Sequence, residues 1–250
     1  MVLVLISPAK TLDFETRRGG LKIHRPHFAD KAAELVSVAK NLSPAQLQKL
    51  MGISPKLAAL NHGRFQDFNT QPQAPAILAY RGDVYQGLNA DDLSDEDLTW
   101  GHDHVGILSG LYGVLQPLDA MQAYRLEMGT SPVGRHKNLY DFWGTQITDR
   151  LNKLIRKNKI SAVIGCASVE YLSSVQIKDL AAPFIQCDFK EMRNGKLQTI
   201  ALFSKKARGL MMRHVIEHRV TDATELKKFD SAGYKFDKTL STDRNFIFVR

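Results

Sequence analysis

Two glycines three residues apart, Gly110 and Gly113, stand inside the apolar run LSGLYGVL at residues 108–115. Glycine weakens regular helices and strands, so this pair indicates backbone that takes a positive φ or closely approaches another group. We interpret the run as a tight hairpin that leads into a helix, with unpaired N–H groups pointing outward as a nest for a phosphate. The alternative is a buried glycine-rich turn between packed elements.

The same pattern looks like the hairpin of helix-hairpin-helix modules, which hold a nucleic-acid backbone through main-chain amides and do not read bases. On this interpretation the residues of the bend bind nucleic acid. They are Gly110, Leu111, Tyr112 and Gly113.

Six longer segments carry a family resemblance: ISPAKTLD at 6–13, RGDVYQGL at 81–88, LSGLYGVLQPLDAMQAYRLEMG at 108–129, LYDFWG at 139–144, ASVEY at 167–171 and KKARGLM at 205–211. Together they resemble the peroxide stress protein YaaA family, and the likeness runs from Leu3 to about Val220. The resemblance implies a cytoplasmic bacterial protein that limits oxidative damage when peroxide rises and is associated with lowered free iron. It also implies a family-specific fold with a DNA-binding helix-hairpin-helix element, and no settled enzymatic reaction.

The composition is that of an ordinary globular protein, with 44% hydrophobic and 24% charged residues in 250. No repeat, low-complexity tract or linker divides the chain, so we predict a single domain over 1–250. No apolar run approaches the roughly 20 residues that cross a bilayer, and the apolar start lacks a charged leader. We therefore expect a cytoplasmic protein, and a monomer.

Positive charge is concentrated in one part of the sequence. Residues 150–219 hold 14 Lys and Arg against 5 Asp and Glu, whereas the rest of the chain holds 20 against 21. Such a concentration suits a polyanionic partner, and a solvated basic face is the alternative. The six acids from Asp91 to Asp103 have no Lys or Arg among them, so we expect that stretch to face away from nucleic acid.

Metal and thiol chemistry receive little support. Cys166 and Cys187 are too few for a four-cysteine zinc site, and we expect reduced core thiols, with peroxide sensing as the alternative. The segment HVIEH at 214–218 matches an inverted zinc-protease pattern, but it needs a third ligand and is flanked by cations. His102 and His104 also fit the solvated end of an acidic helix better than an iron site. We expect no metal and no cofactor.

Hydrophobic periodicity predicts an α/β (α+β) fold, a mixed sheet with surrounding helices. Asn194-Gly195 predicts an antiparallel hairpin between 184–192 and 196–203. Leu139 to Leu154 carries apolar residues at helical spacing. Further strands are predicted at 2–6, 76–80, 105–108, 162–166 and 245–249, further helices at 28–40, 44–51, 55–68, from Ser94 and at 205–220, and a loop at 69–75.

Cations at three places in the chain are candidates for one basic cleft. Lys10 follows the first strand, where parallel-sheet proteins often bind ligands, although it also fits a solvated turn beside Pro8. Arg125 follows the hairpin, and it either clamps a phosphate or pairs with Glu127 or Asp119. The helix from residue 205 has a basic side. The predicted cleft is assembled from Lys10, Arg125, Lys205, Lys206, Arg208 and Arg213.

Two functions fit this cleft. The first is a non-enzymatic protein that binds DNA with weak sequence selectivity through the hairpin amides and the cations, and it requires one positive channel past Gly110, Lys10 and Arg208. The second is an enzyme acting on a nucleotide or another phosphorylated small molecule in the same cleft. A groove roughly 20 Å wide, the diameter of a duplex, favours DNA, whereas a narrow pocket around Lys10 favours the enzyme.

Overall fold

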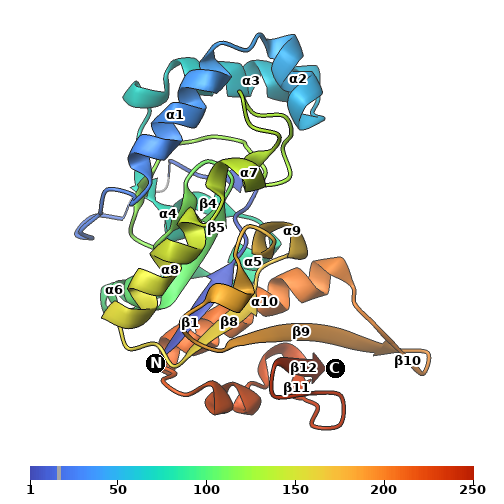
Figure 1. The fold of residues 1–250 in the computed structure, drawn as a ribbon. Coiled ribbons are helices and arrows are strands. Elements are labelled where there is room, and N and C mark those ends of the chain that lie inside the picture. Colours follow the sequence, from blue (N-terminus) through green and yellow to red (C-terminus); the bar gives the residue numbers. More distant parts are fainter. Residues whose placement is uncertain (16–17) are drawn as a thin grey trace.

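A mostly parallel β-sheet forms the centre of the molecule (Figure 1). The computed structural model describes residues 1–15 and 18–250. The strand order of this sheet is β11-β12-β9-β8-β1-β5-β6, and β10 pairs with β9. Strands β6, β10 and β11 run antiparallel to their neighbours. The α/β mixed sheet is thus confirmed. The strands are β1 (Val2–Ile6), β5 (Val105–Ser109), β6 (Gly113–Leu115), β8 (Ala162–Cys166), β9 (Phe184–Arg193), β10 (Lys196–Gln198), β11 (Lys235–Phe236) and β12 (Asn245–Val249).

Strand β1 is the central element, and its five residues are fully buried. A strand that is covered on both faces by crossover helices carries a continuous apolar run, as VLVLI does. It pairs in parallel with β5 and with β8, in a register that sets Ile6 opposite Cys166. The carboxyl ends of β1 and β8 therefore lie side by side, at the edge of the sheet where the parallel strands end.

Helices cover both faces of the sheet, and α1, α2 and α3 form a separate layer beyond one end of it (Figure 1). The β9–β10 hairpin projects to one side of the molecule, at the right of the view (Figure 1). The helices are α1 (Ala29–Lys40), α2 (Pro44–Met51), α3 (Pro55–Gln66), α4 (Ala76–Ala79), α5 (Asp83–Leu88), α6 (Asp95–His104), α7 (Leu139–Trp143), α8 (Gln146–Lys157), α9 (Val169–Leu172) and α10 (Ala201–Glu217). Two further ladders join β2 (Thr11–Leu12) to β4 (Tyr80–Arg81) and β3 (Ala74–Pro75) to β7 (Ala120–Met121).

Helices α5 and α10 touch backbone to backbone. A Cβ on Gly87 would lie 2.1 Å from the carbonyl oxygen of Lys206, and a Cβ on Gly209 would lie 1.8 Å from that of Val84. Any side chain at either position would force the helices apart. This contact holds α10 against the first residues of α5, beside the strand ends.

The prediction of a strand at 76–80 is wrong. Residues Ala76–Ala79 form the short helix α4, and only Tyr80–Arg81 is extended. All four residues of α4 are buried. A short apolar run without polar positions has no readable period, so it fits a buried helix as well as a buried strand.

Two other predicted boundaries shift. The helix expected from Leu139 to Leu154 is divided into α7 and α8 at Gly144, whose φ of 49° interrupts it. The second strand of the predicted hairpin ends at Gln198, and α10 begins at Ala201, inside the range expected to be strand. The helix at 44–51 and the strands at 2–6, 162–166 and 245–249 are confirmed at the predicted residues.

Both cysteines are buried. Within residues 1–15 and 18–250, no group of three or more His, Cys, Asp or Glu side chains is placed to hold a metal ion. Over the same residues, none of the helices combines the length and the apolar character that crossing a membrane requires.

We expect Gly209→Ala to lower the free energy of unfolding by about 3 kcal/mol, because its methyl group overlaps a backbone oxygen that cannot move alone. Urea denaturation measures the change. Gly63→Ala is the matched control: Gly63 also lies in a helix, but nothing stands within 4 Å of its added Cβ, so a gain of about 0.5–1 kcal/mol is expected. Equal effects of both variants would contradict the close contact.

Candidate anion-binding site

The glycine hairpin lies inside the molecule. Leu111 is fully buried, Tyr112 is 2% exposed, and both glycines are buried as well. A Cβ on Gly110 would lie 2.3 Å from the carbonyl oxygen of Leu126, and one on Gly113 would meet the ring of Trp143 at 2.9 Å. The close approach expected from the glycine pair is real, but the neighbours are protein atoms.

The interpretation of this bend as an anion nest before a helix is therefore wrong. The hairpin joins two strands, β5 and β6, and polar groups of its bend bond to protein atoms. The Tyr112 amide donates to Ser109 Oγ at 2.9 Å, and Trp143 Nε1 donates to the Gly110 carbonyl at 3.0 Å. The positive channel past Gly110, Lys10 and Arg208 cannot form, because Gly110 does not reach solvent.

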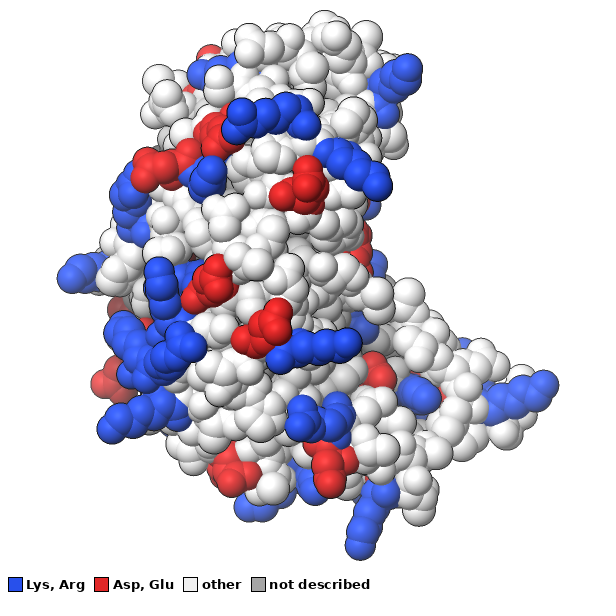
Figure 2. Space-filling view, in the orientation of Figure 1, with Lys and Arg blue, Asp and Glu red and all other residues white. Residues whose placement is uncertain are grey.

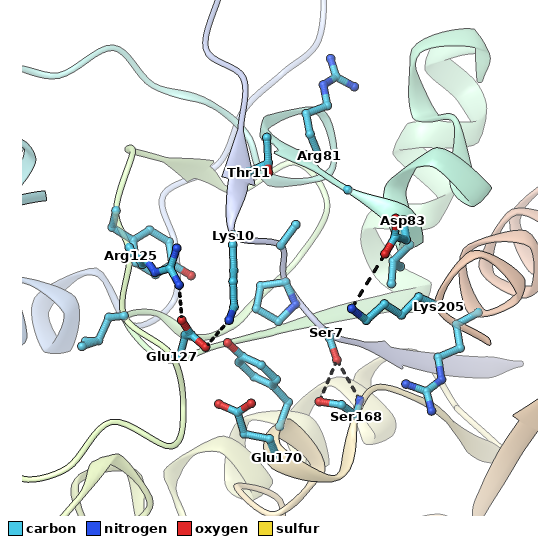
Figure 3. A pocket seen from close by; sticks show the side chains of 18 residues that line it. Ser7, Lys10, Thr11, Arg81, Asp83, Arg125, Glu127, Ser168, Glu170 and Lys205 are labelled. Atoms are coloured by element: carbon cyan, nitrogen blue, oxygen red, sulfur yellow. Dashed lines mark hydrogen bonds and ion pairs between the residues drawn. The ribbon is translucent and has the colours of Figure 1, made fainter. Parts of the chain in front are cut away.

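A cavity of about 510 Å³ lies at the edge of the sheet where β1 and β8 end (Figure 3). The loop after β1 and the loop after β8 meet here, since Ser7 Oγ accepts a hydrogen bond from the Ser168 amide at 2.8 Å. Tyr85 donates to the Ser7 carbonyl at 3.2 Å and fixes the first loop from α5. The walls come from residues 7–11, 81–84 and 124–127, from residues 168, 170 and 171, and from Lys205 and Arg208 of α10.

Charged side chains surround this cavity in partly compensated groups. Glu127 accepts from both Lys10 and Arg125 at 2.8 Å (Figure 3). On the opposite wall Lys205 stands 3.8 Å from Asp83. The lining cations outnumber the lining acids, five to three: Lys10, Arg81, Arg125, Lys205 and Arg208 against Asp83, Glu127 and Glu170.

Two guanidinium groups of the cavity are incompletely paired. The Nε atoms of Arg125 and Arg208 are buried, and neither has a hydrogen-bond partner among residues 1–15 and 18–250. A buried donor without an acceptor costs about 1–3 kcal/mol, more when the group is charged. Both arginines line the cavity, so the hydrogen bonding of its guanidinium groups is incomplete in the described residues 1–15 and 18–250.

At Tyr124 the cavity lining is backed by a buried, hydrogen-bonded cluster of hydroxyl groups. The Tyr124 hydroxyl lies 2.6 Å from the Tyr80 hydroxyl and 2.6 Å from Ser109 Oγ. Burial raises the pKa of Tyr124 to about 12, so the phenol stays protonated at neutral pH. Tyr124 therefore contributes shape and no charge to the lining.

The structure brings together four of the six predicted cleft cations, Lys10, Arg125, Lys205 and Arg208. Lys206 is exposed but does not line the cavity. Arg213 lies outside it as well, where it pairs with Asp92 at 2.5 Å and with Glu217 at 2.7 Å.

The acidic stretch from Asp91 to Asp103 explains part of this arrangement, because its carboxylates pair with cations from distant segments. Asp92 holds Arg213, Asp97 holds Arg219 at 2.7 Å and Asp91 holds Arg81 at 2.7 Å. Asp92 thereby reduces the basic charge of α10, and Asp97 that of Arg219, which follows the helix.

From the sequence, Glu127 was named as a possible partner of Arg125. The lining residues Asp83, Ser168 and Glu170 and the cation Arg81 were missed. The sequence did contain a signal for Ser7 and Ser168, because each follows a buried apolar strand within two residues. Lys10 was predicted as a site residue for the same reason, its place in the loop after a strand.

We expect Gly110→Ala to destabilise the fold by about 3 kcal/mol, because its methyl group meets the Leu126 backbone. Gly129→Ala is the control in the same region, since its Cβ would make only ordinary contact with Glu170 Oε1 at 3.4 Å, and a change within about 0.5 kcal/mol is expected. Thermal and urea unfolding measure both. A stable, unchanged Gly110→Ala protein would contradict the buried hairpin.

Comparison with known proteins agrees with the segments quoted above. Residues 2–240 match the family model described as peroxide stress protein YaaA. A UPF0246 protein of Saccharophagus degradans is 46% identical over 254 residues, which is 100% of this chain and 99% of the relative. A UPF0246 protein of Albidiferax ferrireducens is 46% identical over 256 residues, 100% of this chain and 98% of the relative. The chain belongs to the peroxide stress protein YaaA family.

Proposed function

We propose that this protein acts in the peroxide stress response by binding a phosphorylated small molecule, of about nucleotide size, in the cavity at the ends of β1 and β8. The observation that carries the proposal is the pair of buried guanidinium Nε atoms without acceptors, on Arg125 and Arg208, within the described residues 1–15 and 18–250. Phosphate oxygens accept several hydrogen bonds at once and match the planar guanidinium group.

Charge and size support the same ligand. The cations exceed the acids by two, so a bound dianion would leave the cavity neutral. A cavity of about 510 Å³ falls within the range of small-molecule sites. Lys10 and Lys205 are 62% and 55% exposed, so both ammonium groups can reach a ligand without being uncovered first. The enzyme hypothesis shares this site, with the ligand as its substrate.

Isothermal titration calorimetry with AMP and with pyrophosphate tests the proposal. We expect saturable binding with a dissociation constant below about 1 mM for at least one of them. Arg208→Gln is expected to weaken it by about 30-fold, and Lys205→Gln by about tenfold, since each removes a charge-assisted donor. Lys206→Gln, the neighbour that does not line the cavity, is the matched control and is expected to bind as the unaltered protein does.

A variant that is expected to bind the ligand more tightly distinguishes an electrostatic effect from a general loss of structure. Glu127→Gln removes the carboxylate that Lys10 and Arg125 share, and it is expected to tighten pyrophosphate binding. Equal effects of Lys205→Gln and Lys206→Gln, or no heat from either ligand, would refute the proposal.

DNA binding is the second candidate, and one surface feature favours it. Helices α2 and α3 are joined by a three-residue turn in which Gly52 is exposed with a φ of 60° and Ile53 is buried. Ser54 caps α3 through the Leu57 amide, and Lys49 and Lys56 are exposed on either side. A helix N-terminus beside two lysines suits a phosphodiester backbone. We propose this unit, in place of the buried hairpin, as the helix-hairpin-helix element that would contact DNA.

Fluorescence anisotropy with a 20-bp duplex at several salt concentrations tests this second candidate. The double variant Lys49→Glu/Lys56→Glu is expected to bind more weakly and to reduce the slope of log affinity against log salt by about two, one for each phosphate that is no longer neutralised. Lys235→Glu/Lys238→Glu makes the same change of net charge near β11 and is the control. An equal weakening in both double variants would rule out α2–α3 as the DNA-binding element.

A further inference from the structure

A second cavity, also about 510 Å³, lies at the opposite edge of the sheet. Strand β6 runs antiparallel to β5, so the residues that follow β6 return to the edge where β5 begins. There they meet the end of α6, which leads directly into β5. The lining comprises Lys22, His24, Arg25 and His27, then Thr99, His102 and Asp103 of α6, then Gln116, Leu118 and Asp119, and finally Arg150 and Lys157 of α8.

The cations of this cavity are not all compensated. Arg25 pairs with Asp30 at 2.6 Å, and Lys157 lies 3.6 Å from Asp103. Arg150 is partly buried, and no carboxylate of residues 1–15 and 18–250 lies within 4 Å of it. Its side chain donates instead to a neutral amide oxygen, Gln116 Oε1, at 2.6 Å. A guanidinium in this position still has donors for an anion.

A neutral imidazole adds a second donor. The Leu118 amide donates to His102 Nδ1 at 3.1 Å, so the hydrogen of the neutral ring is on Nε2. Burial and the neighbouring His24, whose ring stacks at 4.5 Å, lower the pKa of His102 to about 4. At neutral pH this ring therefore offers an N–H and no charge.

The third polar group is a buried carboxyl. Asp119 is 4% exposed and accepts from the Gln116 amide through one oxygen at 2.8 Å. No hydrogen bond from the described part of the chain reaches its other oxygen. When this carboxyl carries its proton, the free oxygen can donate a hydrogen bond to an anion beside Arg150 and His102.

We propose that this second cavity is an oxyanion-binding site in which Arg150 and His102 Nε2–H donate to the ligand beside Asp119. The surface agrees with the entry of an anion, because Lys and Arg side chains gather over α8 and the end of α6 (Figure 2). The site shares no residue with the cavity at the ends of β1 and β8, so the two proposals stand or fall separately.

Sulfate is the probe, because its charge is constant from pH 5 to 8. In a titration followed by ¹H–¹⁵N NMR, with chloride at matched ionic strength as reference, the Leu118 amide reports on the site because it is bonded to His102. We expect a saturable shift of this amide with a dissociation constant below about 20 mM. A Leu118 signal that does not respond to sulfate would overturn the proposal.

Variants separate the two cavities. Arg150→Gln retains a donor for Gln116 and is expected to weaken the Leu118 response at least tenfold, whereas Arg208→Gln, in the other cavity, leaves it unchanged. Lys22→Gln alters only an exposed residue at the rim and is expected to weaken it two- to threefold. An unchanged response in Arg150→Gln would overturn the proposal.

The pH dependence gives a further readout. Burial raises the pKa of Asp119 to about 7, against the opposing effects of the Gln116 amide and of Arg150. Its carboxyl is therefore neutral below pH 7 and repels an anion above it, so sulfate affinity is expected to fall between pH 6 and 8. Asp119→Asn keeps the acceptor for the Gln116 amide and should flatten this part of the profile. Identical profiles of the variant and the unaltered protein would contradict the role of Asp119.

The other charged and titratable groups facing the site are Lys22, His24, Arg25, His27, His102, Asp103, Arg150 and Lys157.

Discussion

The buried pairing of β1 with β5 and β8 determines where everything else in this protein lies. All five residues of β1 are fully buried, and burial of each large apolar side chain contributes about 1.5–3 kcal/mol to the stability of the fold. The parallel register with β5 and β8 fixes where the three strands end relative to one another. The Ser7 and Ser168 loops must therefore meet, and the cavity between them follows from the sheet. The glycine contact between α5 and α10 then brings Lys205 and Arg208 to the same place.

Charge that is continuous in sequence is divided in space. The basic segment 150–219 contains most of α8 and all of α10, which cover opposite faces of the sheet (Figure 1). Its cations therefore reach two different cavities, Lys205 and Arg208 in one and Arg150 and Lys157 in the other. Arg213 of α10 pairs with Asp92, and Arg219 just after the helix pairs with Asp97, both from the acidic stretch. In the view of Figure 2, Lys and Arg are accordingly interleaved with Asp and Glu over much of the surface. Linear charge counting indicates a polyanion partner and overstates how much of one surface is open to it.

The elements that were predicted correctly have strong local signals. The helix at 44–51 has a serine cap with proline at its first position, and the strands at 2–6 and 162–166 are uninterrupted apolar runs. The prediction failed where local signals are ambiguous, as at Ala76–Ala79, or where a single glycine divides a periodic segment, as at Gly144. The candidate site was half predicted: cations could be selected by type, but their carboxylate partners come from unrelated segments.

The sequence alone determined that the chain has a mixed α/β fold, that it resembles its family along most of its length, and that Gly110 and Gly113 stand where backbone approaches something closely. Only the tertiary structure decided which groups approach the two glycines: the backbone of Leu126 lies against Gly110, and the ring of Trp143 lies against Gly113. The reason is physical. A glycine pattern encodes the absence of a Cβ, which is a local property, whereas the group that occupies the space comes from residues far along the chain and is known only when the core has formed.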